Sequence, residues 1–89
     1  MQTTTGEKAT QMSWQAEFPQ NIKCESCGGE SRIIFVSHEG ITEFDKSGPF
    51  VCNTRKNGGK GDFWPHDCVA VAIYLCKDCF HFDALGNQG

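Results

Sequence analysis

The sequence lacks any apolar run long enough to cross a membrane. Its longest strongly apolar stretch covers residues 69–76, whereas a membrane-spanning helix needs about 20 apolar residues. Residues 1–21 contain no continuous apolar stretch, so nothing there resembles a secretory signal. A mature secreted chain would look the same, but the simpler expectation is a cytoplasmic protein with reduced thiols and no membrane partner.

Positive charge is also scarce. Eight Lys and Arg residues stand against eleven Asp and Glu residues, which gives a net charge of −3. A general nucleic-acid binder carries a basic surface, so this balance disfavours nucleic acid as a partner and favours protein. No pattern in the sequence indicates an oligomeric state.

Recognisable catalytic motifs are missing as well. The serines and histidines have no nucleophile–base motif around them, and the glycine-rich segment at 55–62 does not have the P-loop pattern. A thioredoxin-like redox motif would need a helix after its cysteine pair, and no helical pattern follows Cys27. We therefore expect a protein that is not an enzyme.

The 89 residues allow one small domain. Residues 1–20 predict a largely disordered lead-in, in which Trp14 and Phe18 either fold back over the core or dock on a partner. Residues 21–83 form the expected domain and 84–89 a flexible tail. A core of that size is marginal, so a metal, a disulfide or a partner is expected to stabilise it.

Cysteine, by contrast, is abundant, with six residues in the chain. Four of them form two pairs, Cys24-x-x-Cys27 and Cys76-x-x-Cys79. A CxxC turn brings two sulfurs to one side of a tight loop, and two such loops complete a tetrahedral site. Gly28 suits the turn after the first pair, because glycine accepts its backbone twist. The spacing predicts one structural Zn²⁺ held by these four cysteines.

The two pairs and the strands predicted between them resemble a zinc ribbon, in which two zinc knuckles are clamped by β-hairpins. The resemblance implies a small, mainly-β, zinc-stabilised domain of antiparallel hairpins. Ribbons commonly separate the pairs by about fifteen to twenty residues, whereas residues 28–75 lie between them here. A treble-clef finger, with a short C-terminal helix through 80–85, is the alternative fold.

Strand patterns fill the interval between the cysteine pairs. Residues 32–36 and 41–44 predict a hairpin that turns at Gly40, and 50–54 predicts a further short strand. Residues 69–75 have the clearest period of two. One face of this last strand is expected to carry its large apolar side chains, which are Val69, Val71, Ile73 and Leu75.

Three further residues have metal-binding side chains at irregular spacing, namely Cys52, His66 and Cys68. They are candidates for a second metal site, with His38 or His81 as a fourth ligand. A Cys52–Cys68 disulfide is another interpretation. The third is two buried thiols and a surface histidine, since free cysteine is often buried.

One basic cluster lies beside aromatic residues. Cations next to aromatic rings suit contact with single-stranded bases or with a partner, and a solvated loop is the alternative. The candidates are Arg55, Lys56, Lys60, Phe63 and Trp64.

The favoured function is a non-catalytic module that binds structural zinc and mediates protein, or nucleic-acid, interaction. A rubredoxin-like iron protein that transfers electrons would use the same four sulfurs. A third hypothesis is single-stranded nucleic-acid binding through residues 55–64.

Overall fold

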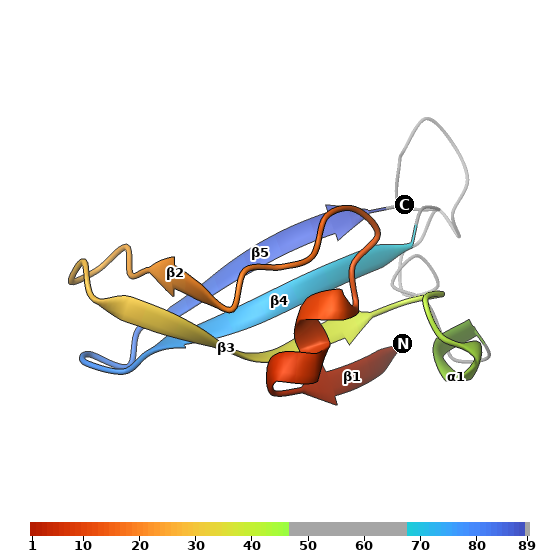
Figure 1. Ribbon diagram of the computed structural model, residues 1–89, viewed down its shortest axis with the longest axis horizontal. Coiled ribbons are helices and arrows are strands. Elements are labelled where there is room, and N and C mark those ends of the chain that lie inside the picture. Colours follow the sequence, from red (N-terminus) through yellow and green to blue (C-terminus); the bar gives the residue numbers. More distant parts are fainter. Residues whose placement is uncertain (47–67, 89) are drawn as a thin grey trace, which may run out of the picture.

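The computed structural model describes residues 1–46 and 68–88 (Figure 1). These residues form one antiparallel sheet with two short helical elements, which confirms the prediction of a small, mainly-β domain. In chain order the elements are β1 (Gln2–Thr5), the 3-10 helix η1 (Glu7–Gln11), β2 (Asn21–Lys23), β3 (Glu30–His38), α1 (Glu43–Lys46), β4 (Val69–Cys76) and β5 (Phe82–Gln88).

The sheet has the strand order β1-β3-β4-β5, and β2 also pairs with β3. β1 lies along the second half of β3, where Thr5 is opposite Phe35, and β2 lies along the first half, where Asn21 is opposite Arg32. A β-bulge between Ile33 and Phe35 separates these two pairings. Pairing of β3 with β4 forms the centre of the sheet, and β5 continues it on the far side of β4.

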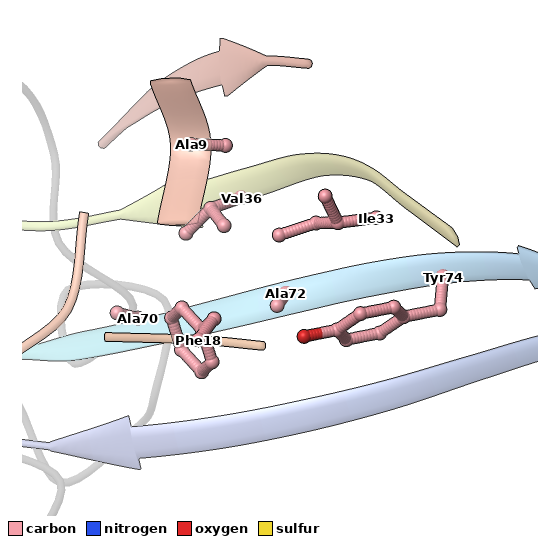
Figure 2. Close-up of a cluster of buried hydrophobic side chains, with 7 residues drawn as sticks. All are labelled: Ala9, Phe18, Ile33, Val36, Ala70, Ala72 and Tyr74. Carbon is pink, nitrogen blue, oxygen red and sulfur yellow. The ribbon is translucent and has the colours of Figure 1, made fainter. Parts of the chain in front are cut away.

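The core lies on one face of this sheet, beneath the N-terminal segment. Tyr74 donates its hydroxyl hydrogen to the Pro19 carbonyl at 2.6 Å, which ties that segment to β4. Figure 2 shows the buried side chains that η1, the following segment, β3 and β4 contribute. They are Ala9, Phe18, Ile33, Val36, Ala70, Ala72 and Tyr74.

The strand predicted at 69–75 is confirmed, and the face that carries its large apolar side chains is not the one buried in the core. Every second side chain of β4 from Ala70 to Cys76 faces the N-terminal segment and is buried. The large apolar side chains that alternate with them, from Val69 to Leu75, are only half-buried. Small alanines on the core face leave room for Phe18, which supplies the apolar volume from another part of the chain.

The prediction of a disordered lead-in at residues 1–20 is wrong for much of that segment. β1 pairs with β3, and η1 buries Ala9 in the core. Phe18 is also buried, which confirms the fold-back interpretation for this residue, while Trp14 remains 37 % exposed and donates Nε1–H to the Glu39 carbonyl. The composition of this segment suggested disorder because β1 is a threonine-rich edge strand. Backbone hydrogen bonds hold such a strand, and they require no pattern of apolar residues in the sequence.

The predicted hairpin of 32–36 with 41–44 does not form. β3 pairs with β4 instead, and α1 begins where the second strand was expected. Thr42 and Asp45 form a capping box: the Asp45 N–H donates to Thr42 Oγ1, and the Thr42 N–H donates to Asp45 Oδ1. The strand predicted at 50–54 lies outside the described residues.

The C-terminal segment also differs from its prediction as a flexible tail at 84–89. Residues 82–88 form β5, paired with β4 along its whole length, so the helix of the treble-clef alternative does not form. Asn87 accepts a hydrogen bond from the Trp14 N–H and donates one to Ser13 Oγ, which joins β5 to the N-terminal segment.

Candidate metal centre

Two loops at one end of the sheet carry the paired cysteines. The first loop joins β2 to β3 and contains Cys24 and Cys27. The second joins β4 to β5, with Cys76 at the end of β4 and Cys79 in the loop. Figure 1 shows both loops at the end of the sheet opposite the chain termini. Antiparallel pairing of β3 with β4, which sets Ser31 opposite Cys76, brings the loops together.

The four sulfur atoms converge on one point. Each lies within 4.8 Å of the others, and no other such group of metal-binding side chains occurs in the part of the chain that the structure describes. The Cys24 and Cys79 sulfurs are 3.7 Å apart, and those of Cys27 and Cys76 are 3.5 Å apart. A tetrahedral site with metal–sulfur bonds near 2.3 Å has sulfur–sulfur edges of about 3.8 Å. The donor set therefore fits one tetrahedral thiophilic ion.

The two loops have the same backbone hydrogen bonds. In the first, the Cys24 N–H donates to the Gly29 carbonyl at 2.7 Å, and the Gly28 N–H donates to the Cys24 carbonyl at 3.0 Å. In the second, the Cys76 N–H donates to the His81 carbonyl at 2.9 Å, and the Phe80 N–H donates to the Cys76 carbonyl at 3.0 Å. We call these loops the first knuckle, residues 24–29, and the second knuckle, residues 76–81.

The residue after the second cysteine is left-handed in both knuckles. Gly28 has φ of 78° and Phe80 has φ of 61°, and Phe80 is the one non-glycine residue with positive φ among the described residues. Positive φ costs little for glycine and about 1–2 kcal/mol for other residues. The second knuckle therefore imposes on Phe80, which is 69 % exposed, a conformation that its side chain disfavours.

Backbone N–H groups point at the sulfurs and favour their thiolate forms. Ser26, Gly29 and Asp78 donate to Cys24, Cys27 and Cys76 respectively, each at 3.4 Å. Such bonds stabilise the charged form of the acceptor.

The buried pair of sulfurs has lowered pKa values. The Cys79 N–H, followed by the Asp78 N–H, lowers the pKa of Cys76 to about 6. The Cys27 N–H in the same way lowers the pKa of Cys24.

The exposed pair of sulfurs behaves differently when no ion is bound. The Gly29 N–H favours the Cys27 thiolate, but the neighbouring Cys76 and Cys79 thiols outweigh it and raise the pKa of Cys27 to about 12. The His81 N–H likewise favours the Cys79 thiolate, while desolvation and the Cys76 and Cys24 thiols raise the pKa of Cys79 overall. Four adjacent sulfurs cannot all ionise without a cation, so a bound dication would relieve their mutual repulsion.

Close packing joins the knuckles at Gly29. A Cβ added there would lie 2.5 Å from Asp78 Oδ2 and 3.2 Å from Cys27 Sγ. The Lys77 N–H donates to the Glu30 carbonyl at 3.2 Å, and the Lys77 ammonium lies 3.8 Å from the Glu30 carboxylate. A side chain at position 29 would therefore displace the Asp78 carboxylate and crowd the Cys27 sulfur.

The remaining predicted site residues are not part of this cluster. Cys68 is half-buried and directly precedes β4. The other residues proposed for a second metal, a disulfide or a nucleic-acid contact lie outside the described residues; they are Cys52, Arg55, Lys56, Lys60, Phe63, Trp64 and His66.

The two histidines proposed as extra ligands occupy opposite ends of the sheet. His81 lies in the second knuckle, with Nε2 3.5 Å from Asp83 Oδ1. His38 ends β3 and is bonded to other groups, as described next, so neither completes a ligand cluster among the described residues.

Sequence reasoning missed a buried polar network at the end of the sheet far from the knuckles. His38 Nδ1 is hydrogen-bonded to Asp45 Oδ2, and His38 Nε2 lies 2.8 Å from Thr4 Oγ1. His38 and Asp45 are fully buried. Burial alone would raise the pKa of Asp45, but hydrogen bonds from His38 and the Thr42 N–H lower it overall. The Thr-x-x-Asp capping pattern at residue 42 was the available signal.

The comparisons with known proteins give no family assignment. No family model matches the chain, and neither a curated protein nor a solved structure shows significant similarity to it. Within residues 1–46 and 68–88, no helix has the length and apolar character needed to span a membrane. The geometry of the sulfur cluster is therefore the feature that indicates a function.

Proposed function

We propose that this chain is a non-catalytic module of the zinc-ribbon type, in which one Zn²⁺ stabilises a surface for a protein partner. The observation that carries the proposal is the convergence of four sulfurs, from two cysteine pairs with 48 residues between them (28–75), to within 4.8 Å of one another. Convergence of this kind, with matched backbone hydrogen bonds in both loops, is the geometry of a structural metal centre.

The donor set supports zinc in a structural role. Thiolate sulfur binds Zn²⁺ strongly, and four protein sulfurs leave no open position at a tetrahedral ion for water or substrate. Hydrolytic chemistry at this centre is therefore not part of the proposal. The same donors accept iron, so the metal must be measured.

The position of the cluster supports a stabilising role. The buried apolar cluster is formed by the N-terminal segment, β3 and β4, and it includes no residue of either knuckle. The ion would therefore hold an end of the sheet that the apolar core does not reach. A net charge of −3, lowered by a further two units at a four-thiolate Zn²⁺ site, favours a protein partner over nucleic acid.

The test is the metal content of the full chain, purified under reducing conditions without a chelator. We expect a colourless protein with one zinc per chain by elemental analysis. Cys76→Ser should lose the ion, and the matched control Cys68→Ser should retain it. A red protein containing iron would replace zinc with the electron-transfer alternative. A well-folded, metal-free chain would overturn the proposal altogether.

A further inference from the structure

The four sulfurs of the cluster differ in their exposure to solvent. Cys27 and Cys79 are exposed, whereas Cys24 and Cys76 are only 2 % and 0 % exposed. Each knuckle therefore contributes one sulfur at the surface and one beneath it. A dissolved reagent reacts with a cysteine only if it can reach the sulfur, so a small oxidant meets the exposed pair first.

Each exposed sulfur contacts a buried sulfur of the other knuckle. Cys27 Sγ lies 3.5 Å from Cys76 Sγ, and Cys79 Sγ lies 3.7 Å from Cys24 Sγ. The sulfurs of a disulfide are about 2.05 Å apart, so each pair has to close by about 1.5 to 1.7 Å to form a bond. The two contacts share no sulfur, and both bonds can therefore form in the same molecule.

Hydrogen bonds of the backbone hold the two knuckles against each other. Pairing of β3 with β4 sets Ser31 opposite Cys76, and the Lys77 N–H donates to the Glu30 carbonyl at 3.2 Å. Each knuckle also has two internal backbone hydrogen bonds. None of these bonds uses a sulfur atom, so the chain itself sets which sulfurs face each other.

We propose that this centre is a redox modification site, at which hydrogen peroxide converts the four thiols into two disulfides between the knuckles. The bonds are Cys27–Cys76 and Cys24–Cys79. The inference concerns the regulation of the centre and, for the release of metal, it rests on the proposed function.

Each bond forms in two steps. The exposed thiolate sulfur attacks one oxygen of hydrogen peroxide, the O–O bond breaks, and the departing hydroxide takes a proton from solvent to become water. The sulfur is then a sulfenic acid. The buried sulfur of the other knuckle attacks it, which forms the S–S bond and releases the sulfenic hydroxyl as a second water. Two sulfurs are oxidised and one peroxide is reduced for each bond.

Oxidation removes the ligands of the centre and replaces them with cross-links. The thiolate is the form of cysteine that binds a metal, so the disulfides do not hold the ion. The two bonds join residues 49 and 55 positions apart, and a disulfide stabilises more when it closes a longer loop. The knuckle end therefore passes from an ion-held state to a cross-linked state and stays closed in both.

The test is a hydrogen peroxide titration of the full chain, purified with its zinc under reducing conditions and then freed of reductant. A colorimetric indicator measures zinc release, and mass spectrometry of a tryptic digest identifies the bonds. We expect the zinc to leave as the bonds form, and dithiothreitol with added zinc should restore the bound form. Retention of zinc and thiols under peroxide would overturn the proposal.

Trypsin separates the bonds between knuckles from those within a knuckle. It cuts on both sides of the first cysteine pair and between the two cysteines of the second pair. Bonds between the knuckles therefore join three peptides into one species, which is the expected result. Peptide 24–32 with an internal disulfide, or cysteines oxidised only to sulfinic or sulfonic acid, would overturn the proposal.

Paired substitutions test the role of exposure. Cys24→Ser with Cys79→Ser keeps Cys27 and Cys76, an exposed and a buried sulfur in contact. The matched control, Cys27→Ser with Cys79→Ser, also loses two ligands but keeps the two buried sulfurs. The first variant should form its disulfide faster by roughly tenfold or more, because only it presents a sulfur to the oxidant. Equal rates would overturn the proposal.

Failure of this inference differs from failure of the proposed function. A chain purified without zinc would contradict the proposed function, and its reduced thiols would still show by peptide mapping whether the knuckles become linked. A zinc-loaded chain that forms its disulfides within the knuckles would contradict the redox inference and leave the structural role of zinc intact.

Discussion

The two ends of the β3–β4 pair are held by different chemistry. At the knuckle end, four sulfurs on two loops converge, and two of the cysteines are exposed. At the far end, the fully buried side chains of His38 and Asp45 bond to each other, and His38 reaches Thr4 on β1. One end presents a site that could hold an ion from solution, and the other is joined by hydrogen bonds within the chain.

The difference shows how a small sheet is stabilised beyond the reach of its core. Loops rich in glycine and polar residues bury little apolar surface, so a metal can replace packing there. At the far end, the buried carboxylate and imidazole satisfy each other and the α1 cap. The two ends should consequently respond to different perturbations.

Removal of the metal should have the largest effect, and it should act on the knuckle end. A chelator strong enough to strip a four-thiolate site should lower the melting temperature by about 20 °C or more, because structural zinc contributes directly to folding free energy. Circular dichroism gives the melting temperature, and amide exchange locates the loss. Exchange should accelerate first at residues 24–29 and 76–81, and zinc should restore protection. Unchanged exchange at the knuckles after metal removal would contradict this comparison.

Asp45→Asn should have the next largest effect, and it should act on the far end. Removing one partner of a buried pair leaves the other uncompensated, so we expect a loss of about 3 kcal/mol in the free energy of unfolding. Chemical denaturation measures this loss, and the metal affinity should stay unchanged. Glu43→Gln is the control, since Glu43 forms an exposed ion pair with Lys46 and its loss should cost less than about 0.5 kcal/mol. Equal losses in the free energy of unfolding for the two variants would show that the buried network stabilises the chain no more than an exposed ion pair does.

On acidification, the two ends of the sheet should lose their stabilising interactions at different pH values. The folded pKa of Asp45 is below its ordinary value of 3.8, so its contribution is complete above pH 3.8 and is lost as the pH falls through the folded pKa. Protons compete with the metal for thiolates whose ordinary pKa is about 8.5, so the ion should leave at a higher pH. Metal release and unfolding can be followed in one titration. The stability difference between wild type and Asp45→Asn should shrink as the pH falls below 3.8. A constant difference would contradict the assignment.

Phe80→Gly should have the smallest effect, and it compares the two knuckles directly. Glycine relieves the left-handed strain at φ of 61°, so the metal-loaded chain should gain about 1 kcal/mol. The converse change, Gly28→Ala, should lose a similar amount. Thermal melting of both variants measures these shifts. Phe82→Gly is the control, because it removes the same side chain from a strand and should destabilise the chain. A loss of stability in Phe80→Gly would mean that the phenylalanine makes contacts that outweigh the strain.

Local patterns in the sequence predicted the parts of the fold that depend on neighbouring residues. The CxxC spacing identified all four sulfurs of the cluster, because each pair is set by one tight turn. The period of two identified β4, since alternation is a property of a single strand. The hairpin at 32–44 was wrong because the Thr42–Asp45 capping box outweighs the strand pattern there.

The far end of the sheet was missed for a different reason. The His38–Asp45 pair joins two residues of ordinary appearance, and only the return of the chain after β3 brings them together. Order in the N-terminal segment was equally hidden, because Phe18 becomes a core residue only where β4 presents small alanines.

The amino-acid sequence by itself determined the number and local geometry of the cysteine pairs and the alternation of the central strand, because these depend on residues within a few positions of each other. Only the tertiary structure decided which face of β4 is covered and which β-strand pairs with β3. It also decided that the two knuckles meet, because each of these outcomes depends on segments far apart in the chain competing for the same surface.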